Sequence, residues 1–103
     1  MIDVTVFVDS EDCYCGILMS GHAGHAEDHQ EGQELVCSAV SALTLNMANS
    51  VEHFTAAKFE AGMEEVSGTF YFRFTGKADP GAMLLMNSLV FGLMDIEETY
   101  GEP

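Results

Sequence analysis

The spacing of apolar residues constrains the fold of this 103-residue chain more than any other feature, because two periodicities alternate along the sequence. Some segments are apolar at every second position, as half-buried strands are, and others at steps of three and four, as amphipathic helices are. The segments with these two periodicities predict strands and helices in the order β-β-α-β-β-α. With 48% hydrophobic residues, we expect residues 1–103 to form one α+β domain, with two helices packed on one face of a four-stranded sheet.

Four segments have the pattern of strands. Residues 2–9 alternate between valine-rich and mixed positions, and after a polar turn the next apolar run is expected to return beside them as a hairpin. A later strand has three phenylalanines on one face, at Phe70, Phe72 and Phe74. The expected strands are residues 2–9, 15–20, 57–63 and 69–75.

Two segments have the helical repeat, and one long segment has none. The first helical stripe consists of Val36, Val40, Leu43, Met47, Val51 and Phe54. A second helix is expected to begin at Asp79 and Pro80 and to end near Tyr100, with an apolar set of Met83, Met86, Val90, Leu93 and Met94. Residues 21–33, rich in glycine, histidine and acids, are predicted to form a flexible exposed loop with a functional task.

The charge of the chain restricts its partners. Seventeen acidic and three basic residues give a formal charge of −14. This charge repels nucleic acids and anionic membranes, and it attracts cations and basic peptides. No run approaches the roughly 20 apolar residues of a membrane span, and the chain begins without a basic leader, so we expect a cytoplasmic protein. Three cysteines, an odd number, agree with a reducing compartment.

Cys37 and His22 suggest a thiol enzyme. His22 lies in the glycine-bounded segment Gly21-His22-Ala23-Gly24-His25, and Cys37 follows fifteen residues later, where the first helix is expected to begin. An ordinary cysteine with a pKa near 8.5 is only about 3% thiolate at pH 7. A helix N-terminus contributes about 0.3–1 kcal/mol, so an imidazolium at His22 would have to supply further stabilisation. The alternative is a buried structural cysteine and a polar loop histidine.

Two residues near Cys37 have supporting roles to consider. Glu34, one helical turn before Cys37, either orients His22 as the third member of a triad or binds the helix N-terminal amides. Ser41, one turn after Cys37 and on the same flank, either hydrogen-bonds near the sulfur or bonds back to its own helix.

Residues 21–41 resemble the ribosomal-processing cysteine proteases. The resemblance lies in Gly21-His22-Ala23 and in the run Glu34-Leu35-Val36-Cys37-Ser38-Ala39-Val40-Ser41, within a short chain of β-β-α-β-β-α order. Members of this family are bacterial homodimeric endopeptidases that remove a short N-terminal extension from the large-subunit ribosomal protein L-twenty-seven.

This resemblance implies roles for individual residues. Cys37 is the nucleophile and His22 the general base, with amides at the helix start near the oxyanion. Gly21, Ala23, Gly24 and His25 belong to a substrate loop, and no cofactor is required. Glu34 departs from the family, which has an aspartate there.

Two other functions remain open at this point. His22, His25 and His29, with Glu27, Asp28, Glu31, Cys13 and Cys15, supply metal-ligand types, although their spacing matches no recognised zinc finger. A non-catalytic interaction module that uses the methionine-rich helices is the third possibility. A homodimer is expected in the protease interpretation.

Overall fold

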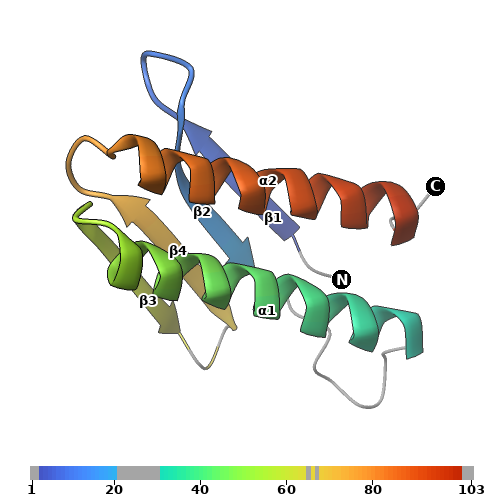
Figure 1. Cartoon of the computed structure of the whole chain (residues 1–103). Coiled ribbons are helices and arrows are strands. Elements are labelled where there is room, and N and C mark those ends of the chain that lie inside the picture. The colour runs from blue at the N-terminus through green and yellow to red at the C-terminus, as the bar shows by residue number, and fades with distance from the viewer. Residues whose placement is uncertain (1–2, 21–30, 65, 67, 101–103) are drawn as a thin grey trace.

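The computed structural model describes residues 3–20, 31–64, 66 and 68–100. In these ranges the elements are β1 (Asp3–Val8), β2 (Tyr14–Ser20), α1 (Glu31–Phe54), β3 (Phe59–Glu64), β4 (Thr69–Phe74) and α2 (Pro80–Tyr100). Figure 1 shows both helices on one face of a single sheet. The predicted element order and the α+β architecture are therefore confirmed.

The strands form an antiparallel sheet in the order β1-β2-β4-β3. The expected hairpin of β1 and β2 is present, and β2 and β4 occupy the centre. Phe72 lies opposite Ile17 on one side and Ala61 on the other, so these residues form one row across the sheet. The register shifts between Phe7 and Val8, which lie opposite Gly16 and Tyr14. This irregularity leaves Cys15 as an extra residue, as in a β-bulge.

The core lies between the sheet and the two helices. As the alternation predicts, Phe70 and Phe72 are buried and Phe74 is half-buried, whereas Tyr71 and Arg73 are exposed. The buried apolar residues are Ile17, Met19, Val40, Met47, Val51, Phe70, Phe72, Ala82, Met86, Leu89 and Val90.

Two residues of the stripe predicted to face the core, and one residue of the apolar set of the second helix, are exposed. Phe54, in the last turn of α1, is 76% exposed, and Met94 of α2 is 60% exposed. Leu43 is 37% exposed, and it lies beside α2, where a Cβ at Gly92 would come within 3.1 Å of Leu43 Cδ1. The buried side of α1 instead includes Thr44. The predicted stripe was therefore wrong at Leu43 and Phe54, because it followed apolar residue types and passed over the polar Thr44 on the buried face.

The start of α2 follows the capping rules. Asp79 Oδ1 accepts a hydrogen bond from the Ala82 amide at 2.8 Å, and Pro80 is the first residue of α2, as predicted. Helix α1 begins at Glu31, so the predicted loop of residues 21–33 extends three residues too far. Acidic residues at a helix N-terminus are favourable, and the first turn of α1 contains Glu31 and Glu34. Neither helix of the described ranges has the length and hydropathy of a membrane span.

Candidate active site

Cys37 lies on a half-buried flank of α1. It is the seventh residue of this helix and a free thiol, and Ser41 follows one turn later with similar burial. Both residues adjoin the buried stripe that contains Val40 and Thr44. The prediction that Cys37 and Ser41 share a flank beside the core is therefore confirmed.

The position of Cys37 along the helix differs from the prediction. The unpaired amides of an α-helix belong to its first four residues, and the dipole effect is confined to the first turn. Because α1 begins at Glu31, those amides belong to residues 31–34, and Cys37 lies in the second turn. The expectation that Cys37 lies where the helix begins was wrong, because the helix begins earlier than its apolar stripe. The groups that bind the oxyanion stay a prediction.

A contact that the sequence did not predict joins α1 to β2. The buried Thr44 hydroxyl donates to the Val40 carbonyl oxygen at 2.8 Å, and Thr44 Oγ1 lies 3.2 Å from Met19 Sδ. Met19 is the penultimate residue of β2. This contact fixes the end of β2 against the middle of α1, two turns beyond Cys37. The helical step from Val40 to Thr44 was the available signal in the sequence.

Most of the other predicted site residues lie outside the description. Gly21, His22, Ala23, Gly24 and His25 are outside the described residues, as are Glu27, Asp28 and His29. For Glu34 the backbone is helical, but its side chain is outside the description. The pairing of Cys37 with His22, the role of Glu34 and the substrate loop therefore stay predictions.

Ser41 does not bond back to its helix. The carbonyl oxygen of Cys37 is the acceptor that such a bond would use, and no hydrogen bond joins the Ser41 hydroxyl to any residue within the described ranges. Thr44 and Thr55 do make bonds of this type, to Val40 and Val51. Of the two roles considered for Ser41, the bond to its own helix is therefore wrong.

Few of the residues in the metal hypothesis lie in the described part of the chain. No group of three or more histidine, cysteine, aspartate or glutamate side chains gathers there in a way that could hold a metal ion. The histidines of that hypothesis lie in residues 21–30. Cys13 and Cys15 are free and half-buried at the β1–β2 hairpin.

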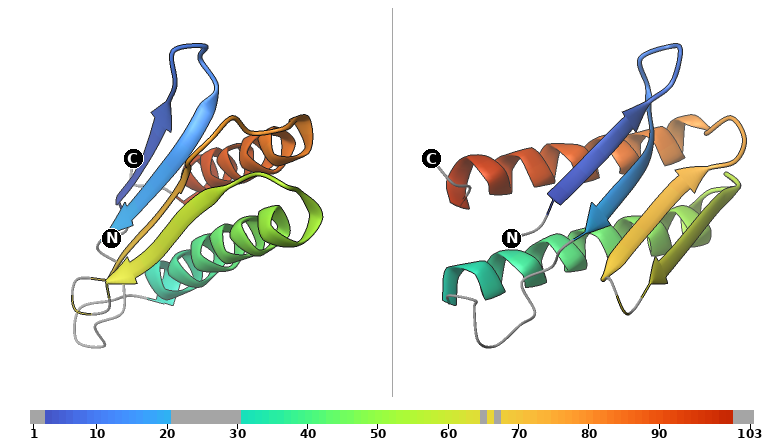
Figure 2. Two further views of the ribbon diagram at one scale, coloured as in Figure 1. Left: turned by 90° about the vertical axis from the view of Figure 1, so that its left-hand side faces the viewer. Right: turned by 180° about the vertical axis from the view of Figure 1, so that it is seen from behind.

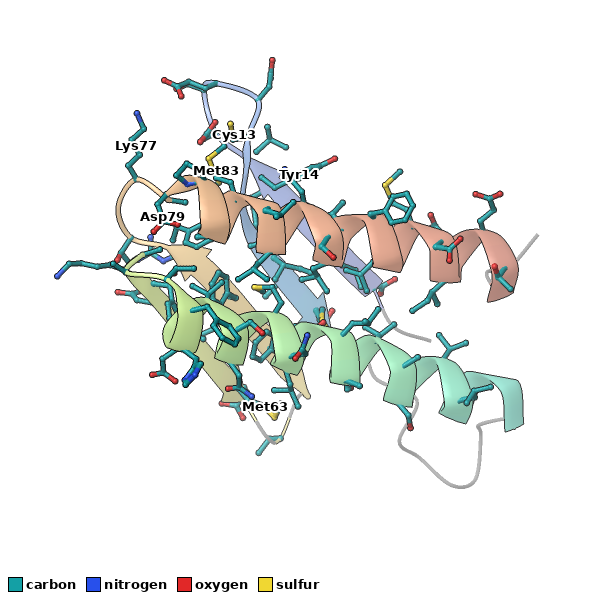
Figure 3. All side chains as sticks on the ribbon, in the orientation of Figure 1. Cys13, Tyr14, Met63, Lys77, Asp79 and Met83 are labelled. Atoms are coloured by element: carbon teal, nitrogen blue, oxygen red, sulfur yellow. The ribbon has the colours of Figure 1, made fainter. Side chains whose placement is uncertain are left out.

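Cys13 lies far along the sheet from the end of β2 that leads to His22. It borders a cavity of about 290 Å³ between the hairpin and α2, lined by Val8, Asp12, Cys13, Tyr14, Met83 and Asn87. Figure 3 shows Cys13 and Met83 together at this place, near the start of α2. The hairpin turn adjoins Tyr14 at one end of β2, whereas His22 follows Ser20 at the opposite end of this strand. This cavity is therefore not the site of the predicted chemistry.

The environment of Cys13 disfavours its thiolate. Desolvation raises the pKa of the Cys13 thiol, and the carboxylates of Asp9, Glu11 and Asp12 raise it further, whereas Lys77 lowers it. Because the thiolate is the nucleophile, a raised pKa reduces the reactive fraction near neutral pH. Cys13 is therefore a poor candidate for the catalytic cysteine.

This environment predicts the alkylation behaviour of Cys13. At pH 8, Cys13 should react with iodoacetamide more slowly than a model thiol peptide, and Asp12→Asn should accelerate the reaction by removing one carboxylate charge. Asp12 has a φ of 63°, a conformation that asparagine also tolerates, so the turn should persist. Peptide mass mapping gives the rate for each cysteine. An unchanged Cys13 rate in Asp12→Asn would contradict this electrostatic account.

Comparisons with known proteins agree with the fold and with a cysteine protease. The family described as cysteine protease Prp matches residues 1–103. The ribosomal processing cysteine protease Prp of Bacillus subtilis is 36% identical over 91 residues, which cover 82% of this chain and 80% of that protein.

Two crystal structures of the ribosomal processing protease Prp from S. aureus have the same fold. One, in complex with a substrate peptide, is 26% identical with a TM-score of 0.89. The other, with a covalently linked product peptide, is 27% identical with a TM-score of 0.84. Each comparison covers 99% of this chain and 93% of the other. The match over the whole chain shows that this protein belongs to the cysteine protease Prp family and is a ribosomal-processing cysteine protease.

Proposed function

We propose that this protein removes a short N-terminal extension from the large-subunit ribosomal protein L-twenty-seven, with Cys37 as nucleophile and His22 as general base. The observation that carries the proposal is the position of Cys37 on a half-buried flank of α1, two turns from the contact between Thr44 and Met19 of β2.

Chain lengths support the pairing of Cys37 with His22. Seven helical residues separate Thr44 from Cys37, a distance of about 10 Å along the axis. Three residues separate Met19 from His22, which span at most about 11 Å when extended. From the Thr44–Met19 contact, α1 toward its N-terminus and β2 toward Ser20 run to the same side of the molecule (Figures 1 and 2). The imidazole therefore has enough chain to reach the sulfur.

The proposed reaction is acyl transfer to the thiol. His22 accepts the proton of the Cys37 thiol, and the sulfur attacks the scissile carbonyl. The protonated imidazole then donates to the leaving amine as the peptide C–N bond breaks, which leaves a thioester. Water, deprotonated by His22, releases the acyl group and restores the thiol. The covalently linked product peptide of the S. aureus relative is compatible with attachment to the enzyme.

Two further residues are proposed to support this reaction. Ser41, whose hydroxyl takes no partner among the described residues, is free to hydrogen-bond near the sulfur or to substrate. Glu34 lies one turn before Cys37 and is proposed to orient His22. Because the free amides of α1 lie a turn from Cys37, we assign the oxyanion donors to the glycine-bounded substrate loop, Gly21 to His25.

Charge and the relatives support the choice of substrate. Ribosomal proteins are generally basic, and a chain of charge −14 attracts a basic extension over long range. The S. aureus relative binds a substrate peptide. A ribosomal-protein substrate also places the proposed activity in the cytoplasm.

The test is direct cleavage of the precursor. Purified protein is incubated with the L-twenty-seven precursor that carries its extension, and the product masses are read over time. The expected result is one N-terminal peptide and one shortened protein, and neither product with Cys37→Ala. A precursor that stays intact at micromolar enzyme would contradict the proposed substrate.

The proposed enzyme is a homodimer that associates through the outer face of α2. Leu84, Phe91 and Met94 are 69%, 76% and 60% exposed on this helix. From Pro80 to Met94 the helix has no ionisable side chain. Two copies that each carry a charge of −14 repel one another, so association favours a face without charge. We infer that a second copy covers this apolar face.

A charge on this face should separate the subunits. Phe91→Glu places a carboxylate on each copy within the proposed interface, and we expect a monomer at tens of micromolar, where the unmodified protein is a dimer. Light scattering after size-exclusion chromatography measures the mass. Phe54→Glu is the matched control, because Phe54 is also 76% exposed but lies at the end of α1. A monomeric unmodified protein, or a dimeric Phe91→Glu, would contradict the assignment.

A further inference from the structure

The outer edge of β1 has no partner among the described residues. The strand order places β1 at one edge of the sheet, where it pairs only with β2 in those ranges. Both views in Figure 2 show β1 at the margin of the sheet. An edge strand of this kind presents main-chain N–H and C=O groups to solvent and can pair with another extended chain.

Natural proteins usually protect such an edge, and β1 has little protection. Its sequence, DVTVFV, contains neither proline, glycine nor lysine, and four of its six residues are valine or phenylalanine. Its register shift lies at the far end, between Phe7 and Val8. The opposite edge strand, β3, contains Gly62 and two exposed glutamates, Glu60 and Glu64. Of the two edges, β1 is therefore the better template for an added strand.

The first half of β1 lies at the end of the sheet that leads to the catalytic residues. Asp3 pairs with Ser20, two residues before His22, and Val4 pairs with Met19, which contacts Thr44 of α1. In Figures 1 and 2, β1 begins on the side of the molecule toward which the N-terminal half of α1 extends. An added strand would run about 5 Å beyond β1. One end of that strand would therefore lie at the end of the sheet where Ser20 ends β2.

We propose that the basic extension of the substrate binds as an additional antiparallel or parallel strand along β1, and that this pairing delivers the scissile bond to Cys37. This proposal rests on the proposed function. Main-chain pairing supplies affinity, and the exposed Asp3 and Asp9 near the two ends of β1 favour a basic peptide. Phe7 and Val8, 47% and 50% exposed, offer an apolar contact for one substrate side chain.

Charge favours substrate over a second copy of the chain at this edge. Pairing of two β1 strands would bring together two chains of charge −14, which repel one another. Unlike the outer face of α2, the β1 edge has carboxylates close by, at Asp3 and Asp9, and these add to the repulsion. A basic peptide would instead neutralise part of the negative charge of the chain.

Amide exchange tests the added strand directly. Uniformly labelled Cys37→Ala protein is studied by NMR with and without a synthetic peptide that spans the extension and the cleavage site of L-twenty-seven. We expect the amides of every second residue within residues 3–8 to exchange at least tenfold more slowly in the complex. The exchange of the β3 amides should not change. Unchanged β1 exchange in a saturated complex, protection at β3, or β1 protection that depends on protein concentration without peptide would overturn the proposal.

A charge-matched pair of variants gives the kinetic counterpart. Thr5→Lys places a cation on the edge strand and should raise KM for the peptide at least tenfold with little change in kcat. Ala61→Lys makes the same charge change on exposed β3 and should change KM less than twofold. Equal effects of the two variants would reject the β1 site while cleavage by the unmodified enzyme upholds the proposed function. No cleavage by the unmodified enzyme would reject both.

Discussion

Replacement of His22 by alanine is expected to lower kcat/KM for the ribosomal-protein precursor by roughly 10²- to 10⁴-fold, the range that a general base contributes. Cys37→Ala should reduce turnover to the uncatalysed background, because it removes the atom that forms the thioester. The double variant should be no slower than Cys37→Ala alone, since residues that act as a unit have non-additive effects. Initial rates from product masses provide the comparison.

A second readout separates a base from a structural histidine. Loss of His22 should also slow alkylation of Cys37 at pH 7, while the rates of Cys13 and Cys15 in the same sample stay constant. His53→Ala is the matched control, because His53 is exposed in the last turn of α1, at the other end from Cys37. A His22→Ala enzyme that keeps more than half of its kcat/KM would assign the proton transfer to another group.

The largest expected effect on stability is that of Phe72→Ala. Phe72 is 1% exposed in the central strand β4, and its ring stacks on Phe59 with a centroid distance of 4.8 Å and meets Phe74 edge-on at 5.2 Å. Removal of a buried phenylalanine ring costs about 3–5 kcal/mol, because it combines lost burial with a cavity. Urea unfolding followed by circular dichroism should therefore show a much lower midpoint, with partial unfolding before denaturant is added if the parent is marginally stable.

The same substitution at an exposed position provides the control. Phe54→Ala removes an identical side chain that is 76% exposed, and we expect the free energy of unfolding to change by less than about 0.5 kcal/mol. The sequence pattern assigns both phenylalanines to the core, whereas the fold buries only Phe72. Similar losses for the two variants would indicate that Phe54 is covered in solution.

The elements could be predicted from the sequence because their signals are local. The alternation around Phe70, Phe72 and Phe74 defines both a strand and its buried face, and Asp79 followed by Pro80 defines the start of α2. The start of α1 was harder to predict, because residues 31–34 include no apolar periodicity and the stripe begins only at Val36. Strand order is a tertiary property, so the edge position of β1 could not be predicted from its own residues.

The geometry around Cys37 could be predicted only in part. The shared flank of Cys37 and Ser41 followed from their spacing of one helical turn, whereas their roles in catalysis stay predictions. Thr44 was missed because it is polar, although its hydroxyl is satisfied by the Val40 carbonyl and it can therefore be buried. The position of Cys37 within α1 was mispredicted because three residues at the start of a helix decide whether Cys37 lies in its first or its second turn.

The location of Cys37 within the hydrogen-bonded body of α1 has a consequence for covalent inhibitors. A cysteine side chain has one torsion that moves its sulfur, and in a helix the χ1 value near +60° is strongly disfavoured. The sulfur therefore has two accessible positions, near χ1 values of 180° and −60°. An electrophile directed at Cys37 needs to suit only those two positions of the sulfur. A rigid inhibitor should therefore react with Cys37 about as fast as one whose electrophile is attached through a flexible linker.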